Sequence, residues 1–190
     1  MENDNIVIRE AAKEDAEIVA TVVSMALGGE PKEHKLYPIF EELAARENAQ
    51  YSYKNALVAT LNGELAGAVV GYDGARLEEL RAPLLALIRE QFGEPLNIEN
   101  ETSAGEFYVD SLAVMPKYRG RGLGRRLLVA ICNKAFEAGY ECVGLLVDFK
   151  NPGAERLYSS LGFKRVNETT FLGIPMWHMQ CCKECFFMLA

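Results

Sequence analysis

The chain has 190 residues, of which 49% are hydrophobic and 25% charged, and a formal net charge of −7. This length suits a single domain over residues 1–190, the composition is ordinary for a soluble globular protein, and the acidic balance argues against nucleic acid as the principal partner. No apolar run approaches the roughly 20 residues that cross a bilayer, so we expect no membrane partner, and the polar residues 1–5 are not typical of a signal peptide. Five cysteines, an odd number without the spacing of a small disulfide scaffold, favour reduced thiols in a cytoplasm.

Periodicity and turn residues predict the elements of the first half of the chain. Apolar residues recur at helical spacing in two segments, which a Gly-Gly-Glu-Pro break separates. Asn62-Gly63 between two apolar runs is a strong signal for a β-hairpin. The predicted elements are a strand over 6–9, helices over 13–27 and 38–48 with the break at 28–31, and hairpin strands over 56–61 and 64–71.

A further helical pattern, over 76–92, lies between the hairpin and the next predicted strand, 107–114. The connection over 76–100 is longer than a tight hairpin between the third and fourth strands requires. It is either a specificity element above a substrate site or a packing helix, and the sequence leaves both interpretations open.

The segment Lys117–Arg126 (KYRGRGLGRR) carries five positive charges, three glycines and no acid. It follows the predicted strand and opens a predicted helix over 123–138, so its free backbone amides and the positive end of the helix dipole would form an anion cradle. Glycine lets a phosphate approach the backbone and adopts positive φ without strain. The simpler alternative is a solvated basic helix start with turn glycines.

The order of glycines and charged residues in this segment distinguishes three kinds of phosphate-binding loop. A Walker loop needs a lysine and a hydroxyl residue after the glycines, and neither follows here. A dinucleotide fingerprint, G-x-G-x-x-G, fails because its last position falls on Arg125 or Leu127. What remains is R-x-x-G-x-G over Arg119–Gly124, which resembles the acyl-CoA pyrophosphate loop of the GNAT superfamily of N-acetyltransferases.

The downstream sequence strengthens this resemblance. The helix over 123–138 has one apolar face and ends at Gly139, and 142–147 reads as a buried strand that completes a βαβ crossover. Asn151–Phe163 resembles the superfamily's N-x-x-A-x-x-L-Y-x-x-x-G-F signature and has the cap, first-turn proline and terminal glycine of a short helix. The last predicted strand is 177–181.

The resemblance implies an α/β (α+β) fold of the GNAT type. This fold is a mixed twisted sheet with helices on both faces, here with a helical insertion between strands 3 and 4. The order of the predicted elements, β-α-α-β-β-(α)-β-α-β-α-β-β, is similar to that fold.

The resemblance also implies acetyl-CoA as co-substrate, with its pyrophosphate on the amides of 119–124 and its pantetheine arm between two strands that splay apart. Leu112 and Val114 are equally compatible with an ordinary core strand, Arg126 with a solvated helix position, and capping alone explains Asn151. The implied cofactor-binding residues are Leu112, Val114, Arg119, Gly120, Arg121, Gly122, Leu123, Gly124, Arg125 and Asn151.

Acyl transfer to an amine needs a proton acceptor for the ammonium and benefits from an acid at the leaving thiolate. By resemblance Tyr158 is the candidate acid, although it would also suit a buried helix face. Glu106, Tyr108 and Asp110 share one face of a strand, so Asp110 is the first candidate base and Glu106 the second. Both carboxylates could instead lie in solvent at a strand edge, and positioning alone could replace a dedicated base.

The C-terminal cysteines do not predict a metal site. Along a strand His178 and Cys182 share one face and Cys181 and Cys185 the other, which works against convergence on zinc. We therefore expect thiols that are buried or at a strand edge, and no metal. His34 and His178 are isolated in the sequence and are expected to be structural or exposed.

The function predicted from the sequence is direct transfer of an acetyl group from acetyl-CoA to a primary amine, either a small cationic amine or a peptide amine. The alternative is a non-catalytic acyl-CoA-binding module of the same fold. Residues 28–54, 76–100 and a loop over 167–176 would choose the acceptor. The superfamily often dimerises, so a homodimer stays open.

Overall fold

The computed structural model describes residues 4–28 and 30–189, and its seven strands form one sheet in the order β1-β2-β3-β4-β5-β7-β6. Neighbouring strands are antiparallel except β4 and β5, which are parallel. The predictions for residues 1–5 and for the break at 28–31 fall partly outside the described residues. The strands are β1 (Ile6–Glu10), β2 (Ala56–Leu61), β3 (Glu64–Asp73), β4 (Phe107–Val114), β5 (Cys142–Asp148), β6 (Lys164–Phe171) and β7 (Ile174–Cys182), and the α-helices are α1 (Ala16–Ala26), α2 (Tyr37–Ala44), α3 (Leu77–Phe92), α4 (Leu123–Glu137), α5 (Pro152–Ser159) and α6 (Lys183–Leu189).

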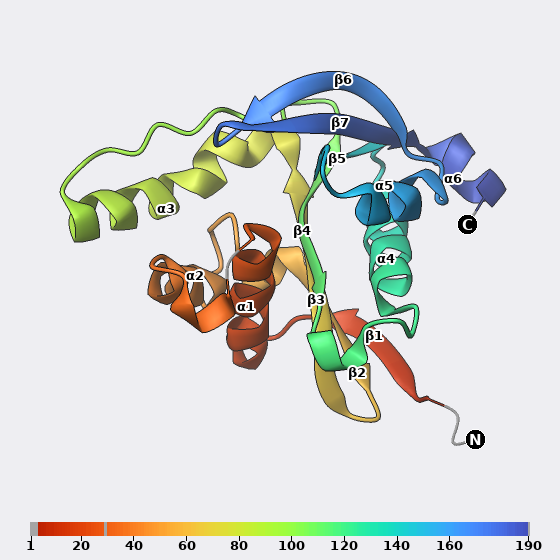
Figure 1. Ribbon diagram of the computed structural model, residues 1–190, viewed down its shortest axis with the longest axis horizontal. Helices are drawn as coiled ribbons and strands as arrows, with labels where there is room; N and C mark the ends of the chain where they lie inside the picture. Colours follow the sequence, from red (N-terminus) through yellow and green to blue (C-terminus); the bar gives the residue numbers. More distant parts are fainter. Residues whose placement is uncertain (1–3, 29, 190) are drawn as a thin grey trace.

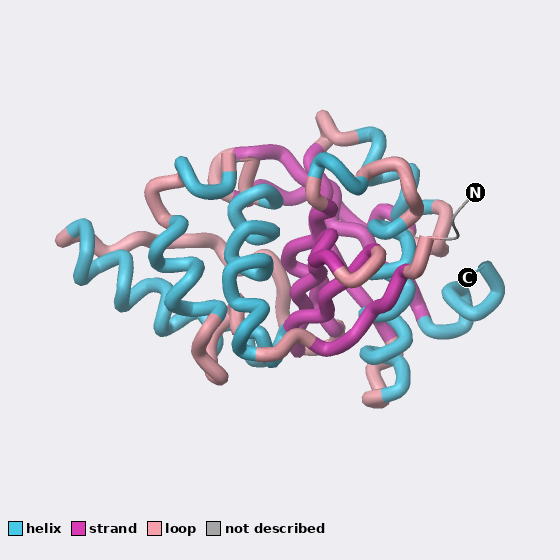
Figure 2. Tube along the Cα trace, turned by 90° about the horizontal axis from the view of Figure 1, so that it is seen from below, coloured by secondary structure: helices cyan, strands magenta, loops and turns pink. Residues whose placement is uncertain are grey.

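Helices cover both faces of the sheet, which confirms the predicted architecture (Figures 1 and 2). On one face α4 presents Leu127, Leu128 and Ile131 to a core that includes residues of β2 to β5. On the other face α1, α2 and α3 form a second core around Phe40 and Leu43. Each large apolar side chain buried in this way contributes about 1.5–3 kcal/mol, so both cores hold the central strands in place.

The first half of the chain follows the prediction with shorter helices. Residues 13–15 form a 3-10 turn before α1, where Asp15 accepts a hydrogen bond from the Ala12 amide at 2.8 Å. The second helix ends at Ala44, and the Arg46 carbonyl accepts instead from the Ser52 hydroxyl at 2.5 Å. The hairpin is confirmed, with φ of 52° at Asn62 and 85° at Gly63.

The predicted insertion is present as α3, which is followed by an extended connection over 93–106 (Figure 1). Leu77, Leu80, Leu84 and Ile88 form a buried stripe against the core shared with α2, so the packing role of this helix is confirmed. Arg81 lies within the same buried stripe and is only 4% exposed. A buried arginine requires polar partners, which are described below.

The C-terminal region differs from the prediction. Residues 167–176 are not a loop, because β6 and β7 form a long antiparallel hairpin that turns at Leu172 and Gly173. The short helix α6 after β7 was not predicted. Its Phe186 is fully buried and packs against Phe136 of α4, with ring centroids 5.2 Å apart. The five cysteines are free thiols, of which Cys132 and Cys181 are buried.

Candidate active site

Strands β4 and β5 diverge after a short parallel pairing. They pair over Phe107–Val109 and Val143–Leu145, and the described residues beyond those points make no further pairs between the two strands. A cleft with a volume of about 650 Å³ opens between them. Its walls include Asp110, Leu112, Ala113 and Val114 of β4, Leu146, Val147 and Asp148 of β5, Asn151, Ala154 and Tyr158 of the α5 segment, and Arg119.

A β-bulge places Asp110 at the mouth of this divergence. Val70 of β3 pairs with Ser111 and Gly71 pairs with Val109, so Asp110 has no partner on β3. Its Oδ2 accepts hydrogen bonds from the Tyr72 hydroxyl at 2.6 Å and from Gln50 Nε2 at 2.9 Å. Its Oδ1 accepts from the Ser111 hydroxyl at 2.8 Å, so the carboxylate is held in one orientation.

Two glycines of the loop before α4 adopt the left-handed backbone conformation. Gly120 and Gly122 have φ of 78° and 77°, and Gly122 is the N-cap of α4. A left-handed N-cap of this kind needs glycine, since a Cβ would be strained there. The Arg126 amide donates to the Gly122 carbonyl at 3.1 Å, and the amides that precede it belong to the first helical turn, where intrahelical acceptors are lacking.

The loop side chains divide between the cleft and the surface. Arg119 lines the cleft, and its Nε donates to the Val114 carbonyl at 3.1 Å. Arg121 pairs with Asp4 at 3.0 Å, and Arg125 donates to the Ser160 hydroxyl at 2.9 Å. Leu123 is 1% exposed and anchors the start of α4 in the core.

Helix α5 brings Tyr158 and Asn151 to the cleft. Asn151 Oδ1 accepts from the Ala154 amide at 3.0 Å, so its capping role is present. Burial raises the pKa of Tyr158 to about 12. The phenol is therefore protonated at neutral pH and can donate a proton or a hydrogen bond into the cleft.

Glu106 lies away from this cleft, against β7. Its carboxylate accepts from Thr102 Oγ1 at 2.6 Å and Gln180 Nε2 at 2.7 Å, and contacts His178 Nε2 at 3.0 Å. Burial acts to raise the pKa of Glu106, but these hydrogen bonds outweigh it and the pKa is lowered. Gly144 lies directly beneath it, and a Cβ there would overlap the carboxylate in this position.

His178, which was expected to be structural or exposed, joins two polar side chains of other segments. It lies between Glu106 and Asn167, with its Nδ1 3.2 Å from Asn167 Oδ1. His34 is a local structural residue, because its Nδ1 accepts from the Leu36 amide at 3.2 Å and its ring stacks on Phe40. A glycine inside the buried run 142–147 was the sequence signal for the close approach of Glu106.

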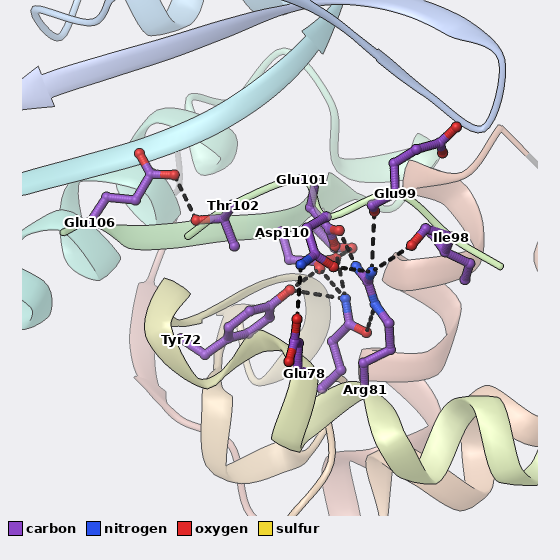
Figure 3. Close-up of polar contacts among 12 residues, drawn as sticks. Tyr72, Glu78, Arg81, Ile98, Glu99, Glu101, Thr102, Glu106 and Asp110 are labelled. Carbon is purple, nitrogen blue, oxygen red and sulfur yellow. Dashed lines mark hydrogen bonds and ion pairs between the residues drawn. The ribbon is translucent and has the colours of Figure 1, made fainter. Parts of the chain in front are cut away.

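Sequence reasoning also missed a buried polar network beside Asp110. Gln50, Tyr72, Arg81 and Glu101 are each at most 8% exposed and connect to Asp110 through hydrogen bonds (Figure 3). The one signal was an arginine within the apolar stripe of the insertion helix.

A smaller cavity of about 90 Å³ adjoins Asp110 on the side away from the glycine loop. Three aromatic rings and two carboxylates are among its lining residues. The rings belong to Tyr51, Tyr108 and Phe171 and the carboxylates to Glu101 and Asp110, and the lining also includes Ser111, Leu146 and Met176.

Two further features bear on the kind of site. Among residues 4–28 and 30–189, no three histidine, cysteine, aspartate or glutamate side chains are grouped so that they could hold a metal ion. No helix in the same ranges is long and apolar enough to cross a membrane.

Comparison with known proteins identifies the fold and the family. The model of the Acetyltransferase (GNAT) family matches residues 23–163. A crystal structure titled as an acetyltransferase superimposes with a TM-score of 0.78 and 34% identity, covering 93% of this chain and 98% of that one. The aminoglycoside acetyltransferase AAC(6′)-Ib in complex with coenzyme A superimposes with a TM-score of 0.65 and 20% identity, covering 97% and 98%.

A curated relative, the mycothiol acetyltransferase of Nocardiopsis dassonvillei, is 48% identical over 59 residues, which are 31% of this chain and 17% of that protein. The chain spans between 17% and 27% of the first curated relatives that it matches. The likeness to them is therefore confined to a segment.

Proposed function

Because the chain belongs to the GNAT acetyltransferase family, we propose that it is an acetyl-CoA-dependent N-acetyltransferase that moves the acetyl group directly to a primary amine. The observation that supports this most strongly is the single cleft between β4 and β5, which has Asp110 on one wall and Tyr158 on another. A proton acceptor and a proton donor thus face one space that the glycine-rich loop also borders.

The residues present fit coenzyme A. The strand edges beyond Val109 and Leu145 leave backbone groups without strand partners, which suits an extended amide-bearing arm. The amides of 120–124 would hold the pyrophosphate, since the Arg119 amide already donates to the Pro116 carbonyl at 3.3 Å, and Arg119 is the loop arginine that lines the cleft. When bound, the cofactor supplies the acetyl thioester.

Within this site Asp110 would take the proton from the substrate ammonium, leaving a neutral amine. Its carboxylate is fixed by three donors yet lines the cleft, which suits a base that must meet its substrate in one orientation. Tyr158, protonated at neutral pH, would donate to the departing sulfur. We do not assign the base to Glu106, because its hydrogen bonds lower its pKa and it lies in a separate pocket beside His178.

The size and lining of the cavity beside Asp110 indicate which kind of acceptor fits. At about 90 Å³ it admits a narrow unbranched amine end rather than a bulky one. Carboxylates and aromatic rings in one small space favour a cation. We therefore propose a primary alkylamine end, carried by a small polycation or a lysine-bearing peptide. The segments 28–54 and 167–176, which were expected to select the acceptor, contribute Tyr51, Phe171 and Met176 to the lining of this cavity.

The experiment is acetyl-CoA turnover, followed as released thiol, with spermidine, kanamycin, lysine and a lysine-bearing peptide. We expect one amine class to be acetylated, Asp110→Asn and Tyr158→Phe to lose most of the turnover, and both variants to retain coenzyme A binding. Asp73→Asn, at the half-buried end of β3 where Asn can keep the cap on Ala75, is the matched control and should behave like wild type. Undiminished turnover by Asp110→Asn would remove the base assignment.

A further inference from the structure

The insertion helix α3 is joined to the segment before β4 by a buried ion pair. Arg81 Nη2 pairs with Glu101, and the two side chains are only 5% and 2% exposed (Figure 3). Arg81 Nη1 also donates to the Glu99 carbonyl at 3.2 Å and to Asn100 Oδ1 at 3.4 Å. The guanidinium therefore fixes the position of the whole 99–101 turn against the helix.

Gln50 connects this ion pair to Asp110. Its Nε2 lies 3.1 Å from Glu101 Oε1 and 2.9 Å from Asp110 Oδ2, so a single amide bridges the two carboxylates. Its Oε1 accepts from Arg81 Nε at 3.4 Å. The arginine thus orients the amide that donates to Asp110.

The charges of this network do not cancel. One guanidinium and two carboxylates leave one negative charge, and Arg81 already neutralises Glu101, so the remaining charge is on Asp110. Without the arginine, two carboxylates bridged by one amide would disfavour each other's ionised forms. Burial and the charge of Asp110 raise the pKa of Glu101, and Arg81 opposes that rise.

The tyrosines around Asp110 do not supply a compensating charge at neutral pH. Burial raises the pKa values of three neighbouring tyrosines well above the ordinary value, so they remain neutral phenols. They are Tyr51 of the loop after α2, Tyr72 of β3 and Tyr108 of β4. On the open side, the same cleft is lined by Asp148, Lys150 and Arg119.

We propose that Arg81 is a positioning residue of the active site, which holds Glu101 as its counter-ion and orients the Gln50 amide, and so holds Asp110 in position to accept the proton of the substrate ammonium. The role of the insertion is then to set the pH range of catalysis, in addition to packing. This inference rests on the proposed function of Asp110 as the base.

The test compares Arg81→Met, Glu101→Gln and the double variant by two measurements. The first is kcat/KM against pH with the best amine of the panel, whose acidic limb reports the protonation of the carboxylate pair. The second, which needs no acceptor, is the titration of the Asp110 and Glu101 carboxyl carbons by ¹³C NMR. Arg89→Met, an exposed arginine on the same helix, is the matched control.

In Arg81→Met we expect the acidic limb and the carboxyl titration to move to higher pH by about one unit or more. Glu101→Gln should move both to lower pH. The double variant should return to within about half a unit of wild type, and Arg81→Lys should retain most of the wild-type pH dependence. A purely structural role would lower kcat/KM equally at every pH.

Three results separate the possibilities. If Arg81→Met folds poorly, Glu101→Gln still tests the proposal. An acidic limb of kcat/KM and a carboxyl titration that stay at the wild-type pH in Glu101→Gln would overturn it. Loss of turnover in Asp110→Asn with no shift in the network variants would refute the role of Arg81 alone. Full turnover in Asp110→Asn would instead refute the proposed base and, with it, the catalytic meaning of any shift.

Discussion

Replacing Gly144 with alanine should displace Glu106 from the position that joins β4 to β7. The added methyl carbon would overlap Oε2 and Cδ of Glu106 and would lie 2.8 Å from Oε1. Real Cβ atoms do not tolerate such contacts, so the carboxylate must move away from Thr102, His178 and Gln180.

The cost follows from those three hydrogen bonds. Bonds to a charged group contribute about 1.5–3 kcal/mol each, so losing all three would cost at most about 5–9 kcal/mol. Rotation of the Glu106 side chain lets it regain water or one partner, and we expect a loss of about 2–4 kcal/mol in the free energy of unfolding.

Urea unfolding followed by circular dichroism measures this loss, with two variants as controls. In Gly153→Ala the new Cβ meets only Asn151 Oδ1 at an ordinary 3.7 Å, so its stability should change by less than about 1 kcal/mol. Adding Gly144→Ala to Glu106→Ala should also cost less than about 1 kcal/mol, because the overlapping carboxylate is gone. An unchanged unfolding midpoint in Gly144→Ala would refute the placement of Glu106.

Three further predictions concern the cleft and the carboxylates. Tyr158→Phe should lower kcat by on the order of 100-fold with little change in the Kd of coenzyme A, and an unchanged kcat would reject Tyr158 as the acid. Because the pKa of Tyr158 is raised to about 12, the pH profile of the wild type should show no alkaline limb from this phenol below about pH 10. Gly122→Val (φ 77°) should abolish calorimetric binding of coenzyme A, whereas Gly93→Val, with the same strain at φ 79° at the end of α3, should not; equal loss in both would point to unfolding. Urea unfolding from pH 7 to pH 3 should show that wild type is more stable than Glu106→Gln above pH 4.5, the ordinary pKa of a glutamate, and that this difference in unfolding free energy disappears as the pH falls through the lowered pKa of Glu106 in the folded state. A difference independent of pH would contradict the lowered pKa.

Local sequence patterns predicted the glycine-rich loop and the start of α5 because their determinants are contiguous. The loop over Arg119–Gly124 and the helix start at Asn151 are short motifs whose backbone geometry depends on their own glycines, caps and proline. The Asn62-Gly63 hairpin was predictable for the same reason.

The polar network beside Asp110 depends on residues that are far apart in the sequence. Gln50 lies 60 positions before Asp110, and Arg81 lies 20 before Glu101, so no local pattern links them. The bulge at Asp110 arises from pairing with β3 and has no signature within β4 itself. The predicted order ended in two strands, but residues 167–176 were expected to form a loop because the polar, exposed β6 lacks a buried alternating face.

The measurement that tests the central claim most directly is thiol release from acetyl-CoA with the amine panel, alongside calorimetric binding of coenzyme A. The account predicts tight binding of coenzyme A and turnover with an unbranched primary amine, reduced strongly in Asp110→Asn and Tyr158→Phe. Tight binding without turnover on any amine would contradict the proposed enzyme and favour a non-catalytic acyl-CoA-binding module.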